Sequence, residues 1–472
     1  MNSTEKYRPI YHFTPKKGFV GDPNGLFYYR GVYHLFYQYN YINYSRPVLG
    51  PVCWGHAVSS DLISWEEKEP AVMNTEDYSC LSGSGIVDRK NVSGLKQGDH
   101  DPILLFWTSN PGYSLGIKMS YSVDGGKTFK DYRDGKETKE VFSWRSGKNF
   151  KDYPTLILDC GYDMKAADRD PKVFYYEPLD RYIMIIYAEH YAPAGVPGFA
   201  FFSSENLLCW TYESFVPGLC ECPDMFELET ENTGEKKWVL GSCCGNYYVG
   251  DFDGHRFIPC QELNTDQRNS ADYASQTWND GKRTVQISFV RSVYRNTDFN
   301  QHLTLPTELG LKKEKGKYIL TRKPVRELEN YETEIMSFEE TEGQGNLFDP
   351  IKSSEALDIR AEFYYDPFLF IGELGTPVGN VQYISPTKTL ETAAPNMHIR
   401  DLAPKDGTVS FRVLTDSQSM EIFADNIYMV FDRFAEKEEL SMTFSGKFRV
   451  KKFSVREINK QKNDFSERKN RY

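Results

Sequence analysis

The chain has 472 residues, 40% of them hydrophobic, and a formal net charge of −11 at pH 7. Because single hydrophobic cores rarely serve chains of this length, one large and one smaller domain are expected. The negative charge disfavours a nucleic-acid-binding protein, whose affinity depends on clustered basic residues that face phosphates.

The N-terminal residues, MNSTEKYRPIYHF, contain no apolar stretch typical of a signal peptide. Nowhere do about 18 uncharged apolar residues follow one another, so no membrane-spanning helix is predicted. The nine cysteines are an odd number without CxxC pairs, which favours reduced thiols over a disulfide framework and gives no metal-binding pattern. These features predict a soluble, cytoplasmic protein.

Strand-like runs recur along the first two thirds of the chain, separated by turn residues. They are GLFYYRGVYHLFYQY, DPILLFWTSN, IKMSYSVDGGKTF, KVFYYEPLDRYIMIIYAEH, GFAFFSS, KKWVLGSCC and TVQISFVRS. Aromatic and β-branched residues dominate these runs, and convincing long amphipathic helices are absent from the sequence. The pattern predicts an all-β protein.

Two short segments echo each other: residues 59–66 read SSDLISWE and residues 203–210 read SSENLLCW. Each places a polar turn after a strand and a Trp at the start of the next strand. Repeats of a few tens of residues with four short strands each are typical of propeller blades. An immunoglobulin-like array is the alternative, but the irregular spacing of the strands favours a propeller.

The character of the sequence changes near Leu320, where a charged segment indicates a connector. After it, LDIRAEFYYD, TVSFRVLTD, SMEIFAD, YMVFDRF and FRVKKFSV alternate like strands of an antiparallel sandwich. We therefore expect a propeller over residues 1–322, a linker over 323–340 and a β-sandwich over 341–472. A homodimer is possible through the sandwich, although no residue pattern demonstrates one.

Three carboxylates each stand just before or at the start of a strand group: Asp22 in GDPNG, Asp170 in RDP and Glu221 in ECPD. Alone, each has a simple structural interpretation. The first segment suits a type I turn, the second a surface ion pair with Arg169, and the third an exposed loop. An Asp beside an Arg is also expected to stay ionised, as stabilising a developing cation requires.

A radial fold would bring these three acids together at its axis. Two carboxylates flanking a glycosidic bond are the minimum for its hydrolysis, and they lie about 5 to 5.5 Å apart in enzymes that retain configuration. A general acid needs a raised pKa, and the apolar neighbours of Glu221 together with Asp22 are expected to raise the pKa of Glu221.

The motifs carry a family resemblance. The stretches GDPNGLFYYRGVYHLFYQYN, WGHAVSSDLISW, LSGSG, RDPKVF, ECPDMFEL, YYVGDFDG and SMEIFAD, in this order, resemble glycoside hydrolase family 32, the invertase and fructanase family. The resemblance implies a five-bladed β-propeller followed by a C-terminal β-sandwich. It also implies retaining hydrolysis of terminal β-D-fructofuranosyl bonds in sucrose or fructans through a covalent fructosyl-enzyme intermediate. It implies no metal and no organic cofactor.

Carried over residue by residue, the resemblance implies that Asp22 is the nucleophile, Glu221 the acid/base and Asp170 the transition-state stabiliser. Around them, the residues implied to bind or line the fructosyl pocket are Asn24, Gln38, Ser82, Arg169, Phe19 and Leu49. The last two stand where the family usually has Trp, and Gly21 stands where it usually has Asn. The pocket lining therefore departs from the family's pattern.

Two other functions remain open. A fructosyltransferase would use the same intermediate and resolve it with a sugar hydroxyl instead of water. A catalytically silent carbohydrate-binding propeller would need no nucleophile, so the presence of both Asp22 and Glu221 argues against it. An arabinan-cleaving relative on the same propeller fits the SGS stretch less well.

Overall fold

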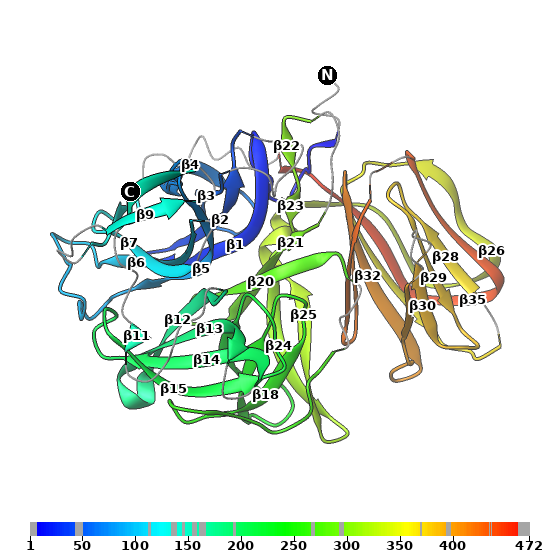
Figure 1. Cartoon of the computed structure of the whole chain (residues 1–472). Helices are drawn as coiled ribbons and strands as arrows, with labels where there is room; N and C mark the ends of the chain where they lie inside the picture. The colour runs from blue at the N-terminus through cyan, green and yellow to red at the C-terminus, as the bar shows by residue number, and fades with distance from the viewer. Residues whose placement is uncertain are drawn as a thin grey trace.

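The computed structural model describes residues 7–42, 51–111, 115–133, 139–143, 147–152, 158–159, 167–191, 195–265, 270–291, 297–368, 371–392, 398–433, 435 and 437–460. Strands make up nearly all regular structure in these ranges. No helix within them is long and apolar enough to cross a membrane. The predicted all-β class is confirmed, as a five-bladed propeller followed by a β-sandwich (Figure 1).

Five sheets form the blades, each with its innermost strand first along the chain. The first has β1 (Gly18–Tyr29), β2 (Val32–Asn40), β3 (Cys53–Ser59) and β4 (Glu66–Val72). The second has β5 (Ser79–Val87), β6 (Ile103–Asn110), β7 (Gly116–Ser122) and β8 (Lys130–Asp131). The third has β12 (Arg169–Tyr176), β13 (Arg181–Tyr191), β14 (Val196–Ser204) and β15 (Trp210–Pro217).

The last two blades complete the ring. The fourth has β16 (Asp224–Glu229), β17 (Lys236–Gly241), β18 (Tyr247–Phe252) and β19 (Phe257–Pro259). The fifth has β20 (Asp272–Asn279), β21 (Thr284–Val290), β24 (Thr307–Glu314) and β25 (Lys317–Pro324), with β23 (His302–Leu303) paired to β21. β22 (Phe299–Asn300), which follows β21 in the chain, pairs in parallel with β1 and so ties the last blade to the first.

Three shorter strands lie between the second and third blades in the chain: β9 (Lys139–Ser143), β10 (Lys148–Asp152) and β11 (Leu158–Asp159). β9 and β10 form a hairpin of their own, and β11 adds to the edge of the third blade beside β15. The 3-10 helix η2 (Glu177–Leu179) joins β12 to β13.

The two echoing segments form the same turn in different blades. The Ser59 hydroxyl accepts the backbone N–H of Leu62 at 2.8 Å, and the Ser204 hydroxyl accepts that of Leu207 at 2.9 Å. Both leucines have left-handed backbones, with φ of 65° and 64°. The turns join the third and fourth strands of the first and third blades, which confirms the echo as a blade repeat.

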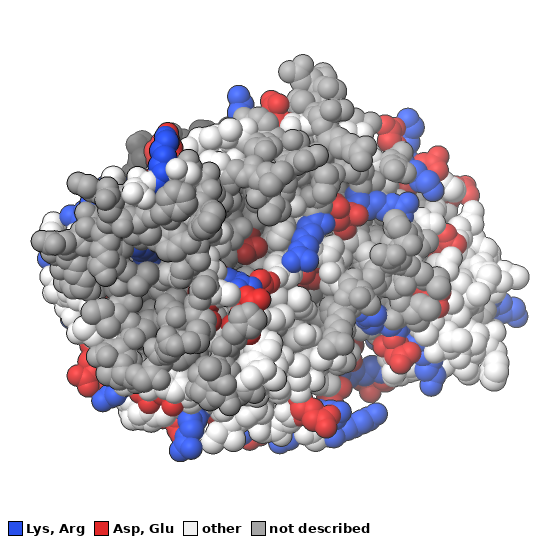
Figure 2. Space-filling model, in the orientation of Figure 1, with Lys and Arg blue, Asp and Glu red and all other residues white. Residues whose placement is uncertain are grey.

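The surface over the propeller is hollowed near its centre, and acidic and basic side chains lie together in this hollow (Figure 2). The inner strands meet around the axis below it, since β5 contacts both β1 and β12, and β20 contacts β1 and β16.

The sandwich is one long sheet that folds over on itself. Its strands are β26 (Glu332–Lys352), β27 (Leu357–Tyr364), β28 (Ile371–Gly375), β29 (Asn380–Ile384), β30 (Thr389–Thr392), β31 (His398–Asp401), β32 (Thr408–Asp416), β33 (Ser419–Ala424), β34 (Ile427–Asp432) and β35 (Glu439–Ile458). β35 pairs with β28 along its first half and with β27 along its second half, which divides the sheet into two layers. A separate apolar core lies between the layers.

The expected linker at residues 323–340 is shorter than predicted. β25 ends at Pro324, the 3-10 helix η3 (Arg326–Tyr331) follows, and β26 begins at Glu332. Residues 332–340 therefore belong to the sandwich sheet, where Glu332 pairs with Ile458 and Phe338 with Phe453. The sequence does not predict this strand, because its residues are mostly polar and exposed and strands are recognised by their buried apolar positions.

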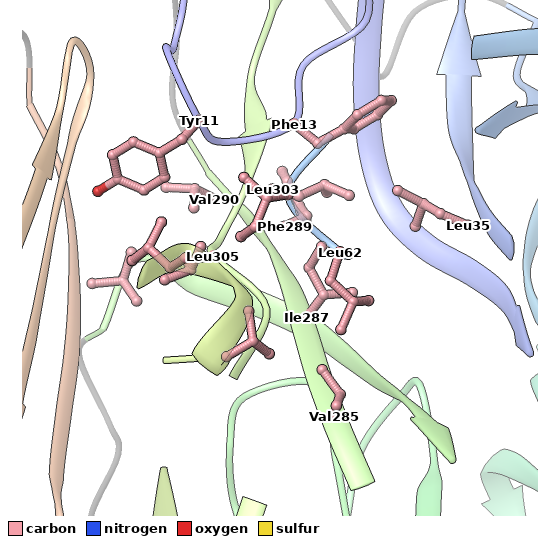
Figure 3. Packing of buried hydrophobic residues seen from close by; sticks show 14 of the residues in the cluster. Tyr11, Phe13, Leu35, Leu62, Val285, Ile287, Phe289, Val290, Leu303 and Leu305 are labelled. Atoms are coloured by element: carbon pink, nitrogen blue, oxygen red, sulfur yellow. The ribbon is translucent and has the colours of Figure 1, made fainter. Parts of the chain in front are cut away.

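An apolar cluster joins the two domains (Figure 3). Tyr11 lies close to Leu305 and Val290 of the fifth blade's segment, and Phe423 and Tyr428 of the sandwich belong to the same cluster. Burying an apolar side chain of this size contributes roughly 1.5 to 3 kcal/mol to the free energy of unfolding. The N-terminal segment thus helps to hold the propeller against the sandwich.

A buried ionic group reinforces this junction. His12 is within 2.9 Å of Asp416 and 2.8 Å of Glu421, and all three side chains are fully buried. Asp416 also accepts the backbone N–H groups of Ile10 and Tyr11 at 2.8 and 3.1 Å. Burial lowers the pKa of His12, but the hydrogen bonds and charges of the two carboxylates outweigh it and raise the pKa from 6.5 to about 9.

The free energy of unfolding is expected to fall as the pH rises through about 9 because His12 then loses its proton. A group whose pKa is higher in the folded state stabilises the fold fully at pH values below its unfolded-state pKa. This contribution is lost as the pH rises through the folded-state pKa. The loss is roughly 3 kcal/mol. Urea unfolding at about pH 7 and about pH 10 measures it. An identical fall in a His12→Gln protein would assign the effect to other groups.

Candidate active site

Four of the five inner strands carry a β-bulge at the level of the candidate residues. The register shifts lie between Val20 and Pro23 in β1, Leu81 and Gly83 in β5, Arg169 and Lys172 in β12, and Tyr273 and Gln276 in β20. A bulge inserts an extra residue and re-aims a side chain, and bulges are common beside active sites. The site therefore lies where these strands begin, at one end of the axis.

The segment expected to form a type I turn at Asp22 to Gly25 lies within strand β1. Two bulges supply the irregular backbone instead, and Gly25 has φ of 59°. A Cβ at Gly25 would lie 2.7 Å from the Phe36 ring, so this close approach requires glycine. Turn-forming residues here shape a strand, because pairing with β2 continues on both sides.

One carboxylate oxygen of Asp22 accepts hydrogen bonds from side chains of two neighbouring strands. The Ser82 hydroxyl donates to Oδ2 at 2.6 Å and the Gln38 side-chain amide donates at 3.2 Å. Gln38 also donates to the Ser82 oxygen at 2.8 Å. The three side chains come from β1, β2 and β5 and form one cluster, as expected from their assignment to a single pocket.

Asn24 has a supporting position. It is fully buried, its side-chain amide donates to the backbone oxygen of Asp22 at 3.0 Å, and its side-chain oxygen accepts the N–H of Gly83 at 3.1 Å. Both ends of the side chain are thus bound to backbone. Asn24 positions Asp22 relative to the second blade, and its place among the substrate-binding residues stays a prediction.

Arg169 joins two carboxylates across the site. One guanidinium nitrogen contacts Glu221 Oε1 at 2.7 Å, and the other contacts Glu189 Oε2 at 2.7 Å. The guanidinium also lies over the Tyr187 ring, 4.6 Å from its centre. The Tyr273 hydroxyl donates to the second oxygen of Glu221. Glu221 is therefore held from two sides, by the third and fifth blades.

Asp170 is buried at the centre of the site. Its backbone N–H donates to the Thr108 hydroxyl at 2.9 Å, and its carboxylate accepts the N–H of Cys222 at 3.1 Å. The Cys222 sulfur lies 3.8 Å from both Asp170 Oδ2 and Asp22 Oδ2. Cys222 thus stands between the two aspartates and brings the first, third and fourth blades into contact.

Backbone strain accompanies this convergence. Asp170, Glu221 and Cys222 have φ of 60°, 43° and 44°, a left-handed region that non-glycine residues rarely adopt. Such conformations cost about 1 to 3 kcal/mol each and persist where the surrounding structure enforces them. Here the conformation of Cys222 lets its N–H reach Asp170 while the Glu221 side chain turns to Arg169.

The pKa values of Asp170 and Glu221 differ from those expected from the sequence. Burial raises the pKa of Asp22 to about 6, although the hydrogen bond from Ser82 lowers this pKa in part. Burial likewise raises the pKa of Asp170 to about 7, although the hydrogen bond from the N–H of Cys222 lowers it in part. Arg169 does not keep Asp170 ionised, because its Nε is 3.9 Å away and its other nitrogens bind Glu189 and Glu221.

The expected raised pKa of Glu221 is not found. Burial raises the pKa of Glu221, but the hydrogen bonds from Tyr273 and Arg169 exceed that effect and the pKa is lowered overall. The order of the pKa values is therefore reversed from the expected one, with Glu221 the strongest acid of the three and the two aspartates weaker acids. The sequence could not indicate this, because the opposing contacts come from other blades.

Phe19 and Leu49 are the two remaining residues that were predicted to line the pocket. Phe19 lies at the start of β1 and is only 6% exposed, with its ring against the position of Gly21. A Cβ at Gly21 would lie 3.1 Å from both the Phe19 ring and the Gln38 oxygen, so these two side chains occupy the space that a side chain at position 21 would need. Leu49 lies outside the described residues.

A separate cavity of about 920 Å³ lies farther along the same inner strands. Its walls include Phe27 of β1, Phe174 of β12 and Trp238 of β17, together with Lys172 and Lys236. None of the three candidate acids lines it. The acidic site and this cavity therefore lie at different levels along the axis.

Sequence reasoning missed Tyr273, Glu189 and Thr108, whose contacts complete the site. Tyr273 and Thr108 carry no motif. For Tyr273 the available signal was its position. The inner strands contribute site residues near their starts, and Tyr273 is the second residue of β20.

The chain is thus a five-bladed propeller that gathers three acids at one end of its axis and carries a β-sandwich, and paired acids are the groups that glycosidases use. The model of the glycosyl hydrolases family 32 N-terminal domain matches residues 12–324. The chain belongs to glycoside hydrolase family 32, which confirms the resemblance seen in its motifs.

Relatives and solved structures agree with this placement. The chain is similar to a levanase of Bacillus subtilis (30% identity, covering 89% of this chain and 65% of the levanase). It is also similar to a fructan beta-fructosidase of Streptococcus mutans (30% identity, 89% of this chain and 31% of the relative). The chain thus spans between about a third and two thirds of these relatives' lengths.

Among solved structures, the exo-inulinase of Aspergillus awamori superposes with a TM-score of 0.82 at 20% identity, covering 97% of this chain and 99% of the inulinase. The beta-fructofuranosidase of Schwanniomyces occidentalis, complexed with fructosyl-erythritol, gives a TM-score of 0.79 at 23% identity, with coverages of 97% and 99%. At these identities the structures support the fold alone.

Proposed function

We propose that the protein is a retaining glycoside hydrolase that releases fructose from terminal β-D-fructofuranosyl bonds. The observation that carries this proposal is the convergence of Asp22 and Glu221 from different blades beside the buried Asp170. The negative charge of Glu221 raises the pKa of Asp22, as expected of carboxylates that face the same small space. Two such acids are the equipment of glycoside hydrolysis.

In the proposed first step, Asp22 attacks the anomeric carbon of the fructosyl unit while Glu221 protonates the departing oxygen. A covalent fructosyl–Asp22 ester forms and the glycosidic bond breaks. In the second step Glu221 takes a proton from water, and the water oxygen displaces Asp22. The hydrogen bonds from Ser82 and Gln38 to Oδ2 leave Asp22 Oδ1 as the attacking atom.

Glu221 must hold a proton before the first step, whereas its contacts with Arg169 and Tyr273 favour its ionised form. The proposal therefore includes a transfer of contacts, in which sugar hydroxyls take over part of Arg169 or Tyr273. Loss of either contact raises the pKa of Glu221, because burial raises this pKa and each of the two contacts lowers it. Asp170, in its anionic form, would face the cation-like fructosyl ring.

The substrate is a small carbohydrate with a terminal fructosyl unit, of which sucrose, inulin-type and levan-type fructans are the candidates. The names of the levanase and the fructan beta-fructosidase support the fructans. We also propose a cytoplasmic location, for which the lack of a disulfide among the described cysteines is the support.

The test is release of free fructose from sucrose, kestose, inulin, levan and sucrose 6-phosphate, with an Asp22→Asn protein as the blank. Fructose from any of these sugars, absent in the blank, supports the hydrolase and identifies its substrate. Longer oligosaccharides at high substrate concentration would favour the fructosyltransferase instead. Tight binding without any product would favour the silent carbohydrate-binding protein.

The basic limb of the pH dependence of kcat/KM is expected near pH 6. The reacting form has Asp22 ionised and Glu221 protonated, although the pKa of Glu221 lies below that of Asp22, so the higher pKa, that of Asp22, sets the limb at which the rate falls with rising pH. Ser82→Ala removes a hydrogen bond that lowers the pKa of Asp22, so the limb should move to higher pH.

Ser84→Ala is the matched control for this shift. Ser84 lies on the same strand, but its hydroxyl accepts the N–H of Val173 at 2.8 Å. The limb should stay in place in this variant. A limb that moves equally in both variants, or moves to lower pH in Ser82→Ala, would remove Asp22 from the assignment.

A further inference from the structure

Three cysteines that are scattered in the sequence lie together beside Glu221. The sulfurs of Cys220 and Cys243 are 3.6 Å apart, those of Cys243 and Cys244 are 3.3 Å apart, and all three lie within 4.8 Å of one another. Cys220 precedes Glu221 directly, and the other two follow β17 in the loop before β18. A search for CxxC pairs could not find this cluster, because the fold assembles it.

The spacing suits a thiophilic metal ion. Sulfur ligands lie about 2.3 Å from Zn²⁺, so two sulfurs of a tetrahedral site are about 3.8 Å apart. The two shorter separations, 3.3 and 3.6 Å, are close to that value, and the third is at most 4.8 Å. Thiolates select soft or borderline ions such as Cu⁺ and Zn²⁺ over Mg²⁺ or Ca²⁺.

Access to the cluster is also suitable. Cys243 is buried at 2% exposure, Cys220 is partly buried and Cys244 is exposed. An ion can therefore arrive from solvent at Cys244. Such a site has three protein ligands and one exchangeable ligand.

We propose that Cys220, Cys243 and Cys244 bind a single thiophilic metal ion of the Zn²⁺ class. The bound sulfurs are thiolates, and the protons they lose pass to solvent. A divalent ion held by three thiolates carries one net negative charge, whereas the three thiols carry none.

Binding at this cluster acts on Glu221 through short connections. The N–H of Cys243 donates to the backbone oxygen of Glu221 at 3.1 Å, and the N–H of Ala274, next to Tyr273, donates to the backbone oxygen of Cys243 at 2.8 Å. An ion that draws the three sulfurs together would fix this segment, so that Glu221 could no longer change its contacts with Arg169 and Tyr273 as the proposed first step requires. We expect inhibition of fructose release; this consequence rests on the proposed role of Glu221, whereas metal binding does not.

The test of binding is titration of the reduced full-length protein with Co²⁺, whose thiolate complexes have strong charge-transfer absorption. The expected result is a band that saturates at one equivalent of Co²⁺ and is displaced by one equivalent of Zn²⁺. Cys244→Ser should weaken the binding at least tenfold, and Cys209→Ser, which changes an exposed cysteine of another blade, should leave it unchanged. No saturable band, or an equal band in Cys244→Ser, would overturn the proposal.

The activity measurement is separate. If fructose release is found, one equivalent of Zn²⁺ should inhibit the wild-type protein severalfold, and a chelator should restore the rate. Cys244→Ser should keep the metal-free rate and lose the inhibition. Saturable Co²⁺ binding without inhibition would keep the site and remove its link to Glu221.

Discussion

Replacing Asp22 by asparagine is expected to lower kcat for fructose release by roughly 10⁴-fold or more. The amide cannot form the fructosyl ester, yet it matches the carboxylate in size, and its oxygen can still accept the hydrogen bonds from Ser82 and Gln38. Steady-state kinetics with the substrate found for the wild-type protein measures the change. Substrate affinity, followed by calorimetry, should change far less than kcat.

The control for this variant is Asn24→Asp. Asn24 binds the backbone of Asp22 and of Gly83, so its replacement disturbs the same strand without removing the nucleophile. We expect a lower melting temperature together with much smaller loss of kcat. If Asp22→Asn retains near-normal turnover, Asp22 is not the nucleophile.

Replacing Glu221 by alanine is expected to lower kcat on sucrose or fructans by roughly 10²- to 10⁴-fold, the usual contribution of a positioned acid or base. The loss should be much smaller in the first step with a β-fructofuranoside of a good leaving group, because such a group departs without a proton. Azide should restore turnover of the activated substrate, since it resolves the fructosyl ester without a base.

Tyr273→Phe separates this role from a merely structural one. The tyrosine hydroxyl binds Glu221 directly, and its removal should raise the pKa of Glu221 and move the acidic limb of the pH dependence of kcat/KM, which the lower of the two pKa values sets, to higher pH. Equal loss on natural and activated substrates in Glu221→Ala would show that Glu221 is not the acid.

Much of the fold follows from local sequence patterns. Alternating aromatic and β-branched runs identify the strands, and the repeat of residues 59–66 in residues 203–210 identifies blades because both segments build the same serine-capped turn. The start of β26 could not be found in this way, since its side chains are mainly polar and exposed. The prediction of a turn at Asp22 was wrong for a related reason, because only pairing with β2 distinguishes a bulged strand from a turn.

The site divides in a similar way. Asp22, Asp170 and Glu221 could be singled out because each lies in a motif at a strand start. Tyr273 and Glu189 could not, since their importance comes from contacts with Glu221 and Arg169 across blades. The protonation of the site was also unpredictable, because burial and the competing partners of Arg169 determine it.

The most direct test of the account is identification of the residue that becomes fructosylated. Glu221→Ala protein mixed with an aryl β-fructofuranoside should release about one leaving group per protein in a burst, because the next step lacks its base. Mass spectrometry of the quenched protein should then find one fructosyl unit on the peptide that contains Asp22. A fructosyl unit on another peptide, or an equal burst in the Asp22→Asn, Glu221→Ala double variant, would contradict the assignment of Asp22 as nucleophile.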